Sequence, residues 1–251
     1  MANPPWLLPD WPAPANIHAR ITTRQTPGIS LPPREHCNLG NRCGDDAAAV
    51  AHNRASLIDL LQLPATPMWL HQVHGSAVLD ADGSVASGEP EPEADAAITR
   101  QSGVVLAVLT ADCLPVLFCT ADAGKIAIAH AGWRGLAGGV LEATVAALDA
   151  DPAEVLTWFG PAIGAASYEI GEEVRQAFID ADADAASAFT ATRHGHWLCD
   201  LDSLARRRLA AIGVTRVSGG GFDTRLDPRF HSFRGDPHCG RFASLIWRSG
   251  G

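Results

Sequence analysis

Three apolar runs of six residues each, VVLAVL, PVLFCT and KIAIAH, follow one another between residues 104 and 130. Runs this short suit strands, because helices usually extend over ten or more residues. Apolar strands have to be covered by other layers of secondary structure. We therefore expect an α/β or α+β layered fold with mixed sheets and flanking helices.

Strand and helix signals alternate through the rest of the chain. Helices are expected at DDAAAVAHNRASLIDLLQL, which opens with cap-type aspartates, at the end of GWRGLAGGVLEATVAALDA, at YEIGEEVRQAFIDA and over residues 200–212. Further strands are expected at IHARIT, MWLHQVH, VLTWFG, VTRV and SLIW. The polar segment Asp80 to Asp95 is expected to be a surface loop within a single domain over residues 1–251. Strand order does not follow from these signals.

Composition narrows the class of protein. With 251 residues and 47% hydrophobic content, the chain can bury a sizeable core. A net charge of -9 and a pI of about 5.5 argue against binding to nucleic acid or to a membrane surface, which usually needs a basic footprint. No apolar run reaches the roughly 18 to 20 residues of a membrane span, and the first residues do not resemble a signal peptide. We expect a cytoplasmic protein.

The six cysteines are spread along a chain that is too long to depend on disulfide bonds. Most of them are expected to be buried thiols that pack as small apolar groups. Cys113 is different because it stands beside an acid in TADCLP, directly after an apolar run.

Three expected strands end near a residue that can bind a metal ion: His71, Cys113 and His130. Imidazole nitrogen and thiolate sulfur are ligands that Zn²⁺ prefers, and three protein ligands with one open position are typical of a catalytic zinc site. His74 lies three residues after His71, so on a strand the two would face opposite sides and could not share one metal. One of them is expected to do something else.

Simpler interpretations exist for the same residues. A lone cysteine or histidine on an apolar strand is usually part of the core. Cys113 with His130 or His71 as its base would also suit a cysteine-type hydrolase without metal. The HGH sequence at residues 194–196 is interpreted as a surface loop rather than a metal site.

Several motifs in register resemble the YfiH/YlmD family of bacterial proteins, called polyphenol oxidases or laccase-domain proteins and also purine nucleoside phosphorylases. The motifs are LHQVHG, TADCLPVLF, HAGWRGL, GPAIG followed by YEIGEEV, NLGNRCGDD near the start, and GRFASLIW near the end. The resemblance covers nearly the whole chain, and agreement among several independent motifs makes it specific.

The resemblance implies a fold, an activity and a set of ligands. The fold is a mixed α/β layered domain like the catalytic domain of cytotoxic necrotizing factor. The activity is phosphorolysis of adenosine, inosine and methylthioadenosine, together with adenosine deamination. The ligands are the first His of HQVHG, the Cys of ADCLP and the His of HAGWRG, which correspond to His71, Cys113 and His130. Zn²⁺ is the expected metal, with copper as the alternative.

Other polar residues are candidates for the substrate site. Arg134 in the glycine-rich GWRGLAGG could hold phosphate, with backbone amides at a helix start, or could form a structural ion pair. Asp112 is a catalytic candidate beside Cys113. Asn38, Arg54 and Arg241 are candidates for binding ribose, base or phosphate, or else are caps, surface charges or core anchors.

The chain departs from the family motif near its C-terminus. Phe233 and Gly235 stand where many members have Tyr and Arg, so a hydroxyl and a guanidinium are absent and phosphate affinity or substrate preference could differ. Ala165 replaces a frequent proline after GPAIG, a conformational change of small consequence.

Three further functions compete with nucleoside chemistry. A copper laccase would need many clustered histidines, and the 10 histidines include a single H-x-H sequence. A zinc cytidine deaminase would carry P-C-x-x-C, which the chain lacks. Some family members are described as peptidoglycan-editing factors that hydrolyse cell-wall precursors. The expected partners are purine nucleosides and phosphate, and the expected assembly is a monomer or homodimer.

Overall fold

The computed structural model describes residues 4–83 and 90–250, and their strands form three sheets. The largest sheet has the order β12-β8-β6-β7-β4-β3 and mixes parallel with antiparallel pairs. Its strands are β3 (Val78–Asp80), β4 (Ala96–Thr99), β6 (Leu114–Thr120), β7 (Ile126–Ala131), β8 (Val155–Phe159) and β12 (Arg216–Gly219). Strand β6 lies antiparallel to both β7 and β8, so two of the three apolar runs pair directly.

The second sheet joins distant parts of the chain in the order β1-β2-β13-β5. Its strands are β1 (Trp6–Leu7), β2 (Ile17–Thr22), β13 (Phe242–Arg248) and β5 (Val105–Thr110). Strand β13 is antiparallel to both neighbours, so that Ser244 lies opposite Ile21 on one side and Val108 on the other. The last strand therefore fastens the first part of the chain to its middle.

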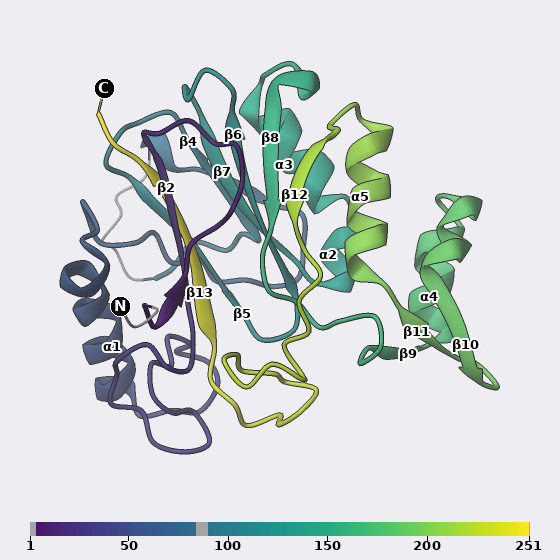
Figure 1. The fold of residues 1–251 in the computed structure, drawn as a ribbon, viewed down its shortest axis with the longest axis horizontal. Coiled ribbons are helices and arrows are strands. Elements are labelled where there is room, and N and C mark those ends of the chain that lie inside the picture. The colour runs from purple at the N-terminus through teal and green to yellow at the C-terminus, as the bar shows by residue number, and fades with distance from the viewer. Residues whose placement is uncertain (1–3, 84–89, 251) are drawn as a thin grey trace.

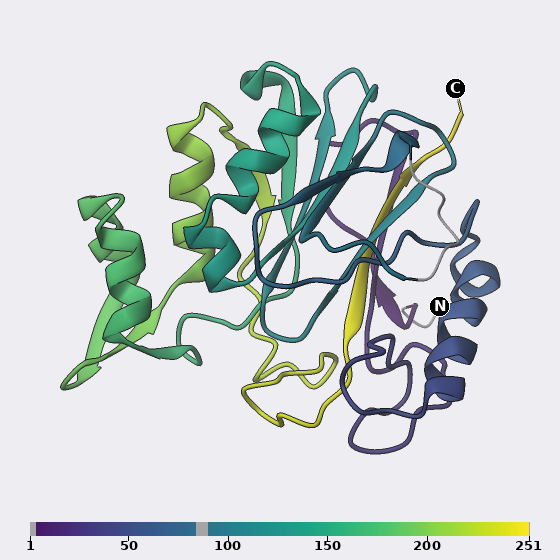
Figure 2. The ribbon, with the colours of Figure 1, turned by 180° about the vertical axis from the view of Figure 1, so that it is seen from behind.

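Alternate side chains of β6 and β7 enter two different cores, which explains why these strands are apolar throughout. Leu114, Val116 and Phe118 pack under the helices, whereas Leu117 and Cys119 pack against the second sheet. The covering helices are α2 (Trp133–Ala137), α3 (Val140–Leu148) and α5 (Leu201–Ala211). Helix α1 (Ala47–Leu61) packs on the outer face of the second sheet. Figures 1 and 2 show the resulting order of layers: helix α1, the second sheet, the largest sheet, and helices α3 and α5.

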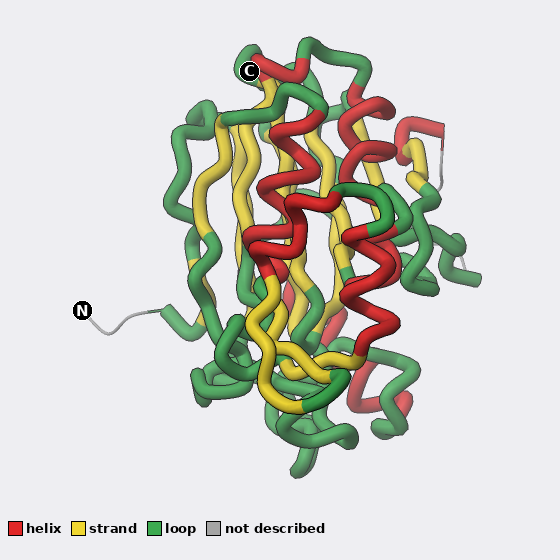
Figure 3. Tube along the Cα trace, turned by 90° about the vertical axis from the view of Figure 1, so that its right-hand side faces the viewer, coloured by secondary structure: helices red, strands yellow, loops and turns green. Residues whose placement is uncertain are grey.

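A small third sheet projects from one side of these layers (Figures 1 and 3). It has the order β10-β11-β9 and carries helix α4. The elements are β9 (Glu169–Gly171), α4 (Glu172–Ile179), β10 (Phe189–Arg193) and β11 (His196–Cys199), and the short 3-10 helices of the chain are η1 (Ala81–Gly83), η2 (Pro152–Glu154) and η3 (Ala183–Ala188). The predicted surface loop is confirmed at His194 and Gly195, which form the hairpin turn between β10 and β11, whereas His196 begins β11.

Two expectations about local structure are wrong. MWLHQVH is no continuous strand, because only Met68 and His71 form isolated bridges. The segment Asp80 to Asp95 is no surface loop over its whole length, because Asp95 is fully buried where it enters β4, and residues 84–89 lie outside the described part. Both errors concern one region, since His71 pairs with Glu93.

The expected helix at YEIGEEVRQAFIDA is confirmed only from Glu172 onward, because Glu169–Gly171 forms β9. The other expected elements are present, and the mixed α+β layered architecture is confirmed. All six cysteines are free thiols, and four of them are buried. Within the described residues, no helix has the length and apolar character needed to cross a membrane.

Candidate metal centre

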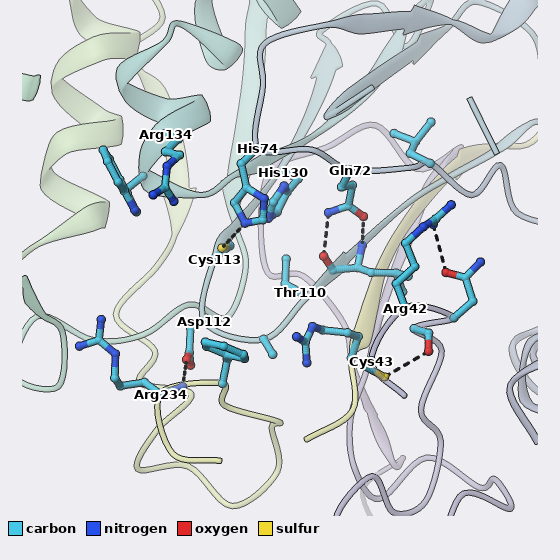
Figure 4. A pocket seen from close by; sticks show the side chains of 18 of the residues that line it. Arg42, Cys43, Gln72, His74, Thr110, Asp112, Cys113, His130, Arg134 and Arg234 are labelled. Atoms are coloured by element: carbon cyan, nitrogen blue, oxygen red, sulfur yellow. Dashed lines mark hydrogen bonds between the residues drawn. The ribbon is translucent and has the colours of Figure 1, made fainter. Parts of the chain in front are cut away.

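His74, Cys113 and His130 come from three separate segments and meet at one end of a cavity (Figure 4). Cys113 lies in the turn between β5 and β6, His130 is near the end of β7, and His74 belongs to the segment before β3. One nitrogen or sulfur atom from each lies within 4.8 Å of the other two. The Cys113 Sγ is 3.8 Å from the His74 Nε2, and the two imidazole rings meet edge to face with centroids 4.8 Å apart. Two nitrogens and a sulfur at this spacing can converge on one cation.

The structure places His74, not His71, in this group, which corrects the ligand choice made from the sequence. The His71 backbone is bound to the segment before β4: its N–H donates to the Pro92 carbonyl, and its own carbonyl accepts from the Ala94 N–H. His74 has a left-handed φ of 62°, which turns the chain and removes the strand alternation that was expected to place the two histidines on opposite sides.

Gly132, the glycine of HAGWRG, allows the three side chains to approach each other. A Cβ atom at this position would lie 2.8 Å from the His74 Cδ2 and 3.0 Å from the Cys113 Sγ. Any larger residue would push the side chains of His74 and Cys113 away, so their close approach requires glycine at position 132.

Asp112 fixes the turn that carries Cys113. Its φ of 87° is unusual for a residue other than glycine. The carboxylate is buried and accepts from the Thr224 hydroxyl at 2.7 Å and from the Arg234 N–H at 2.6 Å. The Asp112 carbonyl accepts from the Ile163 N–H. These contacts tie three loops together, so Asp112 has a structural role here. The predicted catalytic role of Asp112 stays a prediction.

Cys113 and His130 influence each other's ionisation. Burial alone would raise the pKa of the Cys113 thiol, but the neighbouring His130 and His74 outweigh it and lower that pKa to about 6. Burial would lower the pKa of His130, but the Cys113 thiolate and the hydrogen bond to Asp95 raise it to about 9. The His130 Nδ1 lies 2.8 Å from the Asp95 Oδ1. The site therefore favours a thiolate, which is the form of cysteine that binds metal.

The cavity beside this group has a volume of about 490 Å³. Aromatic rings of Trp133, Tyr168 and Phe233 line it together with apolar backbone and side-chain atoms. Its size falls within the range of small-molecule sites, roughly 300 to 1,000 Å³. A flat, ring-containing molecule fits such walls.

Four arginines also line the cavity: Arg42, Arg134, Arg234 and Arg241. Arg42 forms an ion pair with Glu91. None of the ion pairs among the described residues includes any of the other three. Among the described residues, these three guanidinium groups have no carboxylate partner, and they outnumber the one carboxylate in the lining, that of Asp112.

The three unpaired arginines are held by aromatic rings and carbonyls instead. The Arg134 guanidinium lies 4.4 Å from the centre of the Trp133 ring, and that of Arg234 lies 5.0 Å from the Tyr168 ring. A carbonyl at residue 169 accepts from Arg234, and Arg241 donates to carbonyls at residues 239 and 240. Their charges are positioned but remain uncompensated.

Asn38 and Arg54, both predicted to bind substrate, do not line the cavity. Asn38 is buried, and its amide group bonds to Asp45, to the Gly40 backbone and to the Arg241 N–H. Arg54 donates to the Leu39 carbonyl, pairs with a glutamate and lies over an aromatic ring. Of the three predicted substrate-binding residues, the structure brings Arg241 alone to the cavity.

The three side chains fit a zinc ion. Ligand atoms of a tetrahedral Zn²⁺ site are separated by roughly 3.5 Å, given metal–ligand bonds of about 2.0 to 2.3 Å. The 3.8 Å between the Cys113 Sγ and the His74 Nε2 is close to this value. His74 is exposed and Cys113 is half-buried, so an ion held by the three side chains would be accessible from the cavity.

A multi-copper centre does not fit in the same way. Several copper ions would need several groups of histidine or cysteine side chains. In the two described stretches of the chain, His74, Cys113 and His130 are the one group of three or more potential ligands whose atoms converge.

Sequence reasoning missed His74, Asp95 and the aromatic wall of Trp133 and Tyr168. Gly75 was the available signal for His74, because a glycine after a polar residue often marks a turn rather than a strand. Asp95 gave no signal, since an acid in a polar segment looks like surface charge. Its burial and bonds appear only in the folded chain.

Comparison with known proteins finds relatives over nearly the whole chain. Residues 18–249 match the family model described as "Multi-copper polyphenol oxidoreductase laccase". A purine nucleoside phosphorylase of Xylella fastidiosa strain 9a5c is 49% identical, with 97% of each chain covered. The protein "Purine nucleoside phosphorylase YfiH" of Escherichia coli K12 is 46% identical, with 96% of this chain and 98% of the relative covered.

Solved structures show the same fold. A Neisseria meningitidis protein superposes with a TM-score of 0.93 at 43% identity, covering 98% of this chain and 100% of that one. YlmD of Geobacillus stearothermophilus superposes with a TM-score of 0.90 at 29% identity, covering 100% and 98%. With the fold, the family model and relatives of nearly equal length in agreement, the chain belongs to the laccase-domain family of YfiH and YlmD.

Proposed function

We propose that this protein is a zinc-dependent purine nucleoside phosphorylase that acts on adenosine, inosine and methylthioadenosine and also deaminates adenosine. The proposal depends on two features of one cavity: a His74, Cys113 and His130 group that suits Zn²⁺, and three arginines that take part in no ion pair among the described residues. Relatives over nearly the full length are named purine nucleoside phosphorylases, which supports the same activity.

Three groups of residues in the cavity have different roles in this reaction. The rings of Trp133, Tyr168 and Phe233 provide flat apolar surfaces for a purine. Arg134 and Arg234 bind the phosphate co-substrate, because a guanidinium matches a phosphate dianion in charge and hydrogen-bond geometry. Zn²⁺ held by His74, Cys113 and His130 supplies Lewis-acid chemistry and lowers the pKa of water to about 7.

Phosphorolysis exchanges two bonds at the ribose C1′. An oxygen of phosphate forms a bond to C1′, the bond from C1′ to the purine nitrogen breaks, and the purine leaves with a proton. The products are the free base and ribose 1-phosphate, or methylthioribose 1-phosphate from methylthioadenosine. The protein's contribution is to hold the dianion beside C1′ and to exclude competing water.

Product analysis tests the proposal. Zinc-loaded enzyme is incubated with adenosine in the presence and absence of phosphate, and the products are separated by chromatography. We expect adenine and ribose 1-phosphate only with phosphate, and inosine in both mixtures. Zinc-loaded enzyme that yields neither ribose 1-phosphate nor inosine would refute the nucleoside assignment.

A cysteine-type hydrolase, including one that edits peptidoglycan precursors, is the second candidate. It is favoured by the thiolate of Cys113, whose pKa is lowered to about 6, next to His130 and His74. A thiolate beside an imidazole is also a nucleophile with its base. Removal of metal separates the two candidates, because a chelator abolishes a zinc-dependent reaction and leaves cysteine hydrolysis intact.

Other expectations stay proposals of the same kind. Residues 1–251 act as one catalytic domain, which the shared cores of the two large sheets support. The partners are purine nucleosides and phosphate rather than nucleic acid, in keeping with the net charge of -9. We propose a monomer or homodimer in the cytoplasm.

A further inference from the structure

Asp95 lies at the entrance to β4 and is fully buried. Its carboxylate accepts four hydrogen bonds. Oδ2 accepts from the N–H groups of Val73 at 3.1 Å and Gly75 at 2.7 Å, and Oδ1 accepts from the His74 N–H at 2.9 Å. The fourth donor is the His130 Nδ1, 2.8 Å from Oδ1. One side chain therefore contacts the backbone of one metal-binding residue and the ring of another.

The turn at residues 73–75 depends on this carboxylate. Three successive backbone N–H groups converge on it, and such a concave set of amides is a binding site for an anion. The set forms because His74 has a left-handed φ of 62°, a conformation that residues other than glycine rarely adopt. Asp95 supplies the hydrogen bonds that favour this conformation, and the conformation sends the His74 side chain toward Cys113.

The same carboxylate decides which nitrogen of His130 can bind a metal. A carboxylate can only accept hydrogen bonds, so the proton of the imidazole must be on Nδ1. The lone pair of the neutral ring is then on Nε2, the other nitrogen. The backbone reinforces the arrangement, because the His130 N–H donates to the Asp95 carbonyl at 2.7 Å.

Gln72 holds the other end of the turn. Its Nε2 donates to the Leu109 carbonyl, and its Oε1 accepts from the Leu109 N–H, both at 2.8 Å. The amide thus pairs with the edge of β5 as a neighbouring strand would. Figure 4 shows this pair beside His74 and His130. The segment 72–75 is fastened by side chains at both ends.

We propose that Asp95 is the positioning residue of the metal centre: one buried carboxylate sets the tautomer of His130 and holds the turn that presents His74. The centre is thereby formed before the metal binds. This inference depends on the metal site in the proposed function, but not on the identity of the substrate.

The test compares zinc affinity among folded variants by competition with a chromophoric chelator. In Asp95→Asn the amide NH₂ faces backbone N–H donors and cannot accept from them, so zinc affinity should fall about 10- to 100-fold. The matched control is Asp82→Asn, whose carboxylate also accepts from a backbone N–H and a hydroxyl, near the other end of β4. Affinity in the control should stay within about twofold of wild type.

A measurement on wild type covers the case in which Asp95→Asn does not fold. With ¹⁵N-labelled histidine in the zinc-loaded protein, the proton of His130 should be on Nδ1 and the metal on Nε2. The reverse assignment overturns the proposal, and so does an Asp95→Asn variant that binds zinc as tightly as wild type. If wild type itself takes up no zinc, the metal site and this proposal both fail; loss of nucleoside activity with normal zinc uptake would refute only the substrate assignment.

Discussion

His71 and His74 lie three residues apart, and their backbones decide which one can bind metal. We expect His74→Ala to lose bound zinc and to lower activity at least about a hundredfold, because it removes one of three ligands. His71→Ala is the matched control and should keep a full equivalent of zinc, since His71 lies outside the group. Metal analysis of both purified variants decides the matter. Zinc loss in His71→Ala with retention in His74→Ala would restore the choice made from the sequence.

His231 makes the protein sensitive to acid. It is fully buried, and neither ring nitrogen has a hydrogen-bond partner among residues 4–83 and 90–250. Burial first, and then nearby Arg24, lower its pKa to about 4. The unfolded chain, with an ordinary pKa near 6.5, then binds a proton between pH 6.5 and 4 that the folded chain does not. The contribution of His231 to the free energy of unfolding is therefore fully present above about pH 6.5. It is lost as the pH falls toward 4, by up to about 3 kcal/mol.

The variant His231→Leu tests this contribution. Leucine cannot bind a proton, so the stability difference between pH 7 and pH 4.5 should shrink by about 2 to 3 kcal/mol relative to wild type. Urea unfolding at both pH values measures it, with the exposed His52→Leu as control. The same pH dependence in wild type and His231→Leu would show that other groups cause the acid sensitivity.

At the residue scale, the kinds of ligand could be predicted from the sequence, but not the choice between neighbours. Cys113 and His130 stand at the ends of strong apolar runs, where strand ends are easily placed. His74 depends on a left-handed turn that exists because Asp95, twenty-one residues later in the chain, accepts its N–H. Contacts between residues so far apart leave no periodic signal.

At the scale of elements, the chain's local signals were reliable where tertiary contacts agreed with them. The runs that became β6 and β7 are apolar because a core lies on each side, and IHARIT forms β2. The sheet order was not predictable, because β13 joins β2 and β5 across more than half of the chain. MWLHQVH failed as a strand because its groups bond to Asp95 and to the segment before it instead.

The buried side-chain amide of Asn53 connects helix α1 to the loop at residues 28–43, which leads to the cavity. Asn53 is 0% exposed; it accepts from the Ile29 N–H and donates to Ser30 and to the Asn38 carbonyl. Asn53→Ala should lower the free energy of unfolding by about 2 to 4 kcal/mol, because it leaves buried partners unsatisfied.

Hydrogen exchange should locate the effect of Asn53→Ala in residues 28–43, which α1 fastens. The control is Ser56→Ala on the same helix, whose hydroxyl bonds only within α1. Ser56→Ala should change stability by less than about 0.5 kcal/mol. Equal losses in both variants would contradict the loop anchor, because alanine is a better helix former than asparagine or serine and neither substitution weakens the helix through propensity.

At the scale of the whole molecule, the arginines that line the cavity are opposite in sign to the net charge of the chain. The chain has a net charge of -9, yet the cavity is lined by Arg134, Arg234 and Arg241, none of which takes part in an ion pair among the described residues. Leaving cations unpaired on an acidic protein favours an anionic ligand at that place over a structural role.

Arg134 is the place to test this charge distribution. Its guanidinium is exposed and lies over Trp133, so Arg134→Ala should leave folding and zinc content unchanged. Loss of a charged partner of phosphate costs about 2 to 3 kcal/mol, so phosphorolysis of adenosine should fall roughly a hundredfold, whereas deamination, which uses no phosphate, should persist. Arg175→Ala is the control, because Arg175 also lies over a tryptophan, Trp197, but away from the cavity. An unchanged ratio of phosphorolysis to deamination in Arg134→Ala would exclude Arg134 from phosphate binding and leave the anion to Arg234 and Arg241.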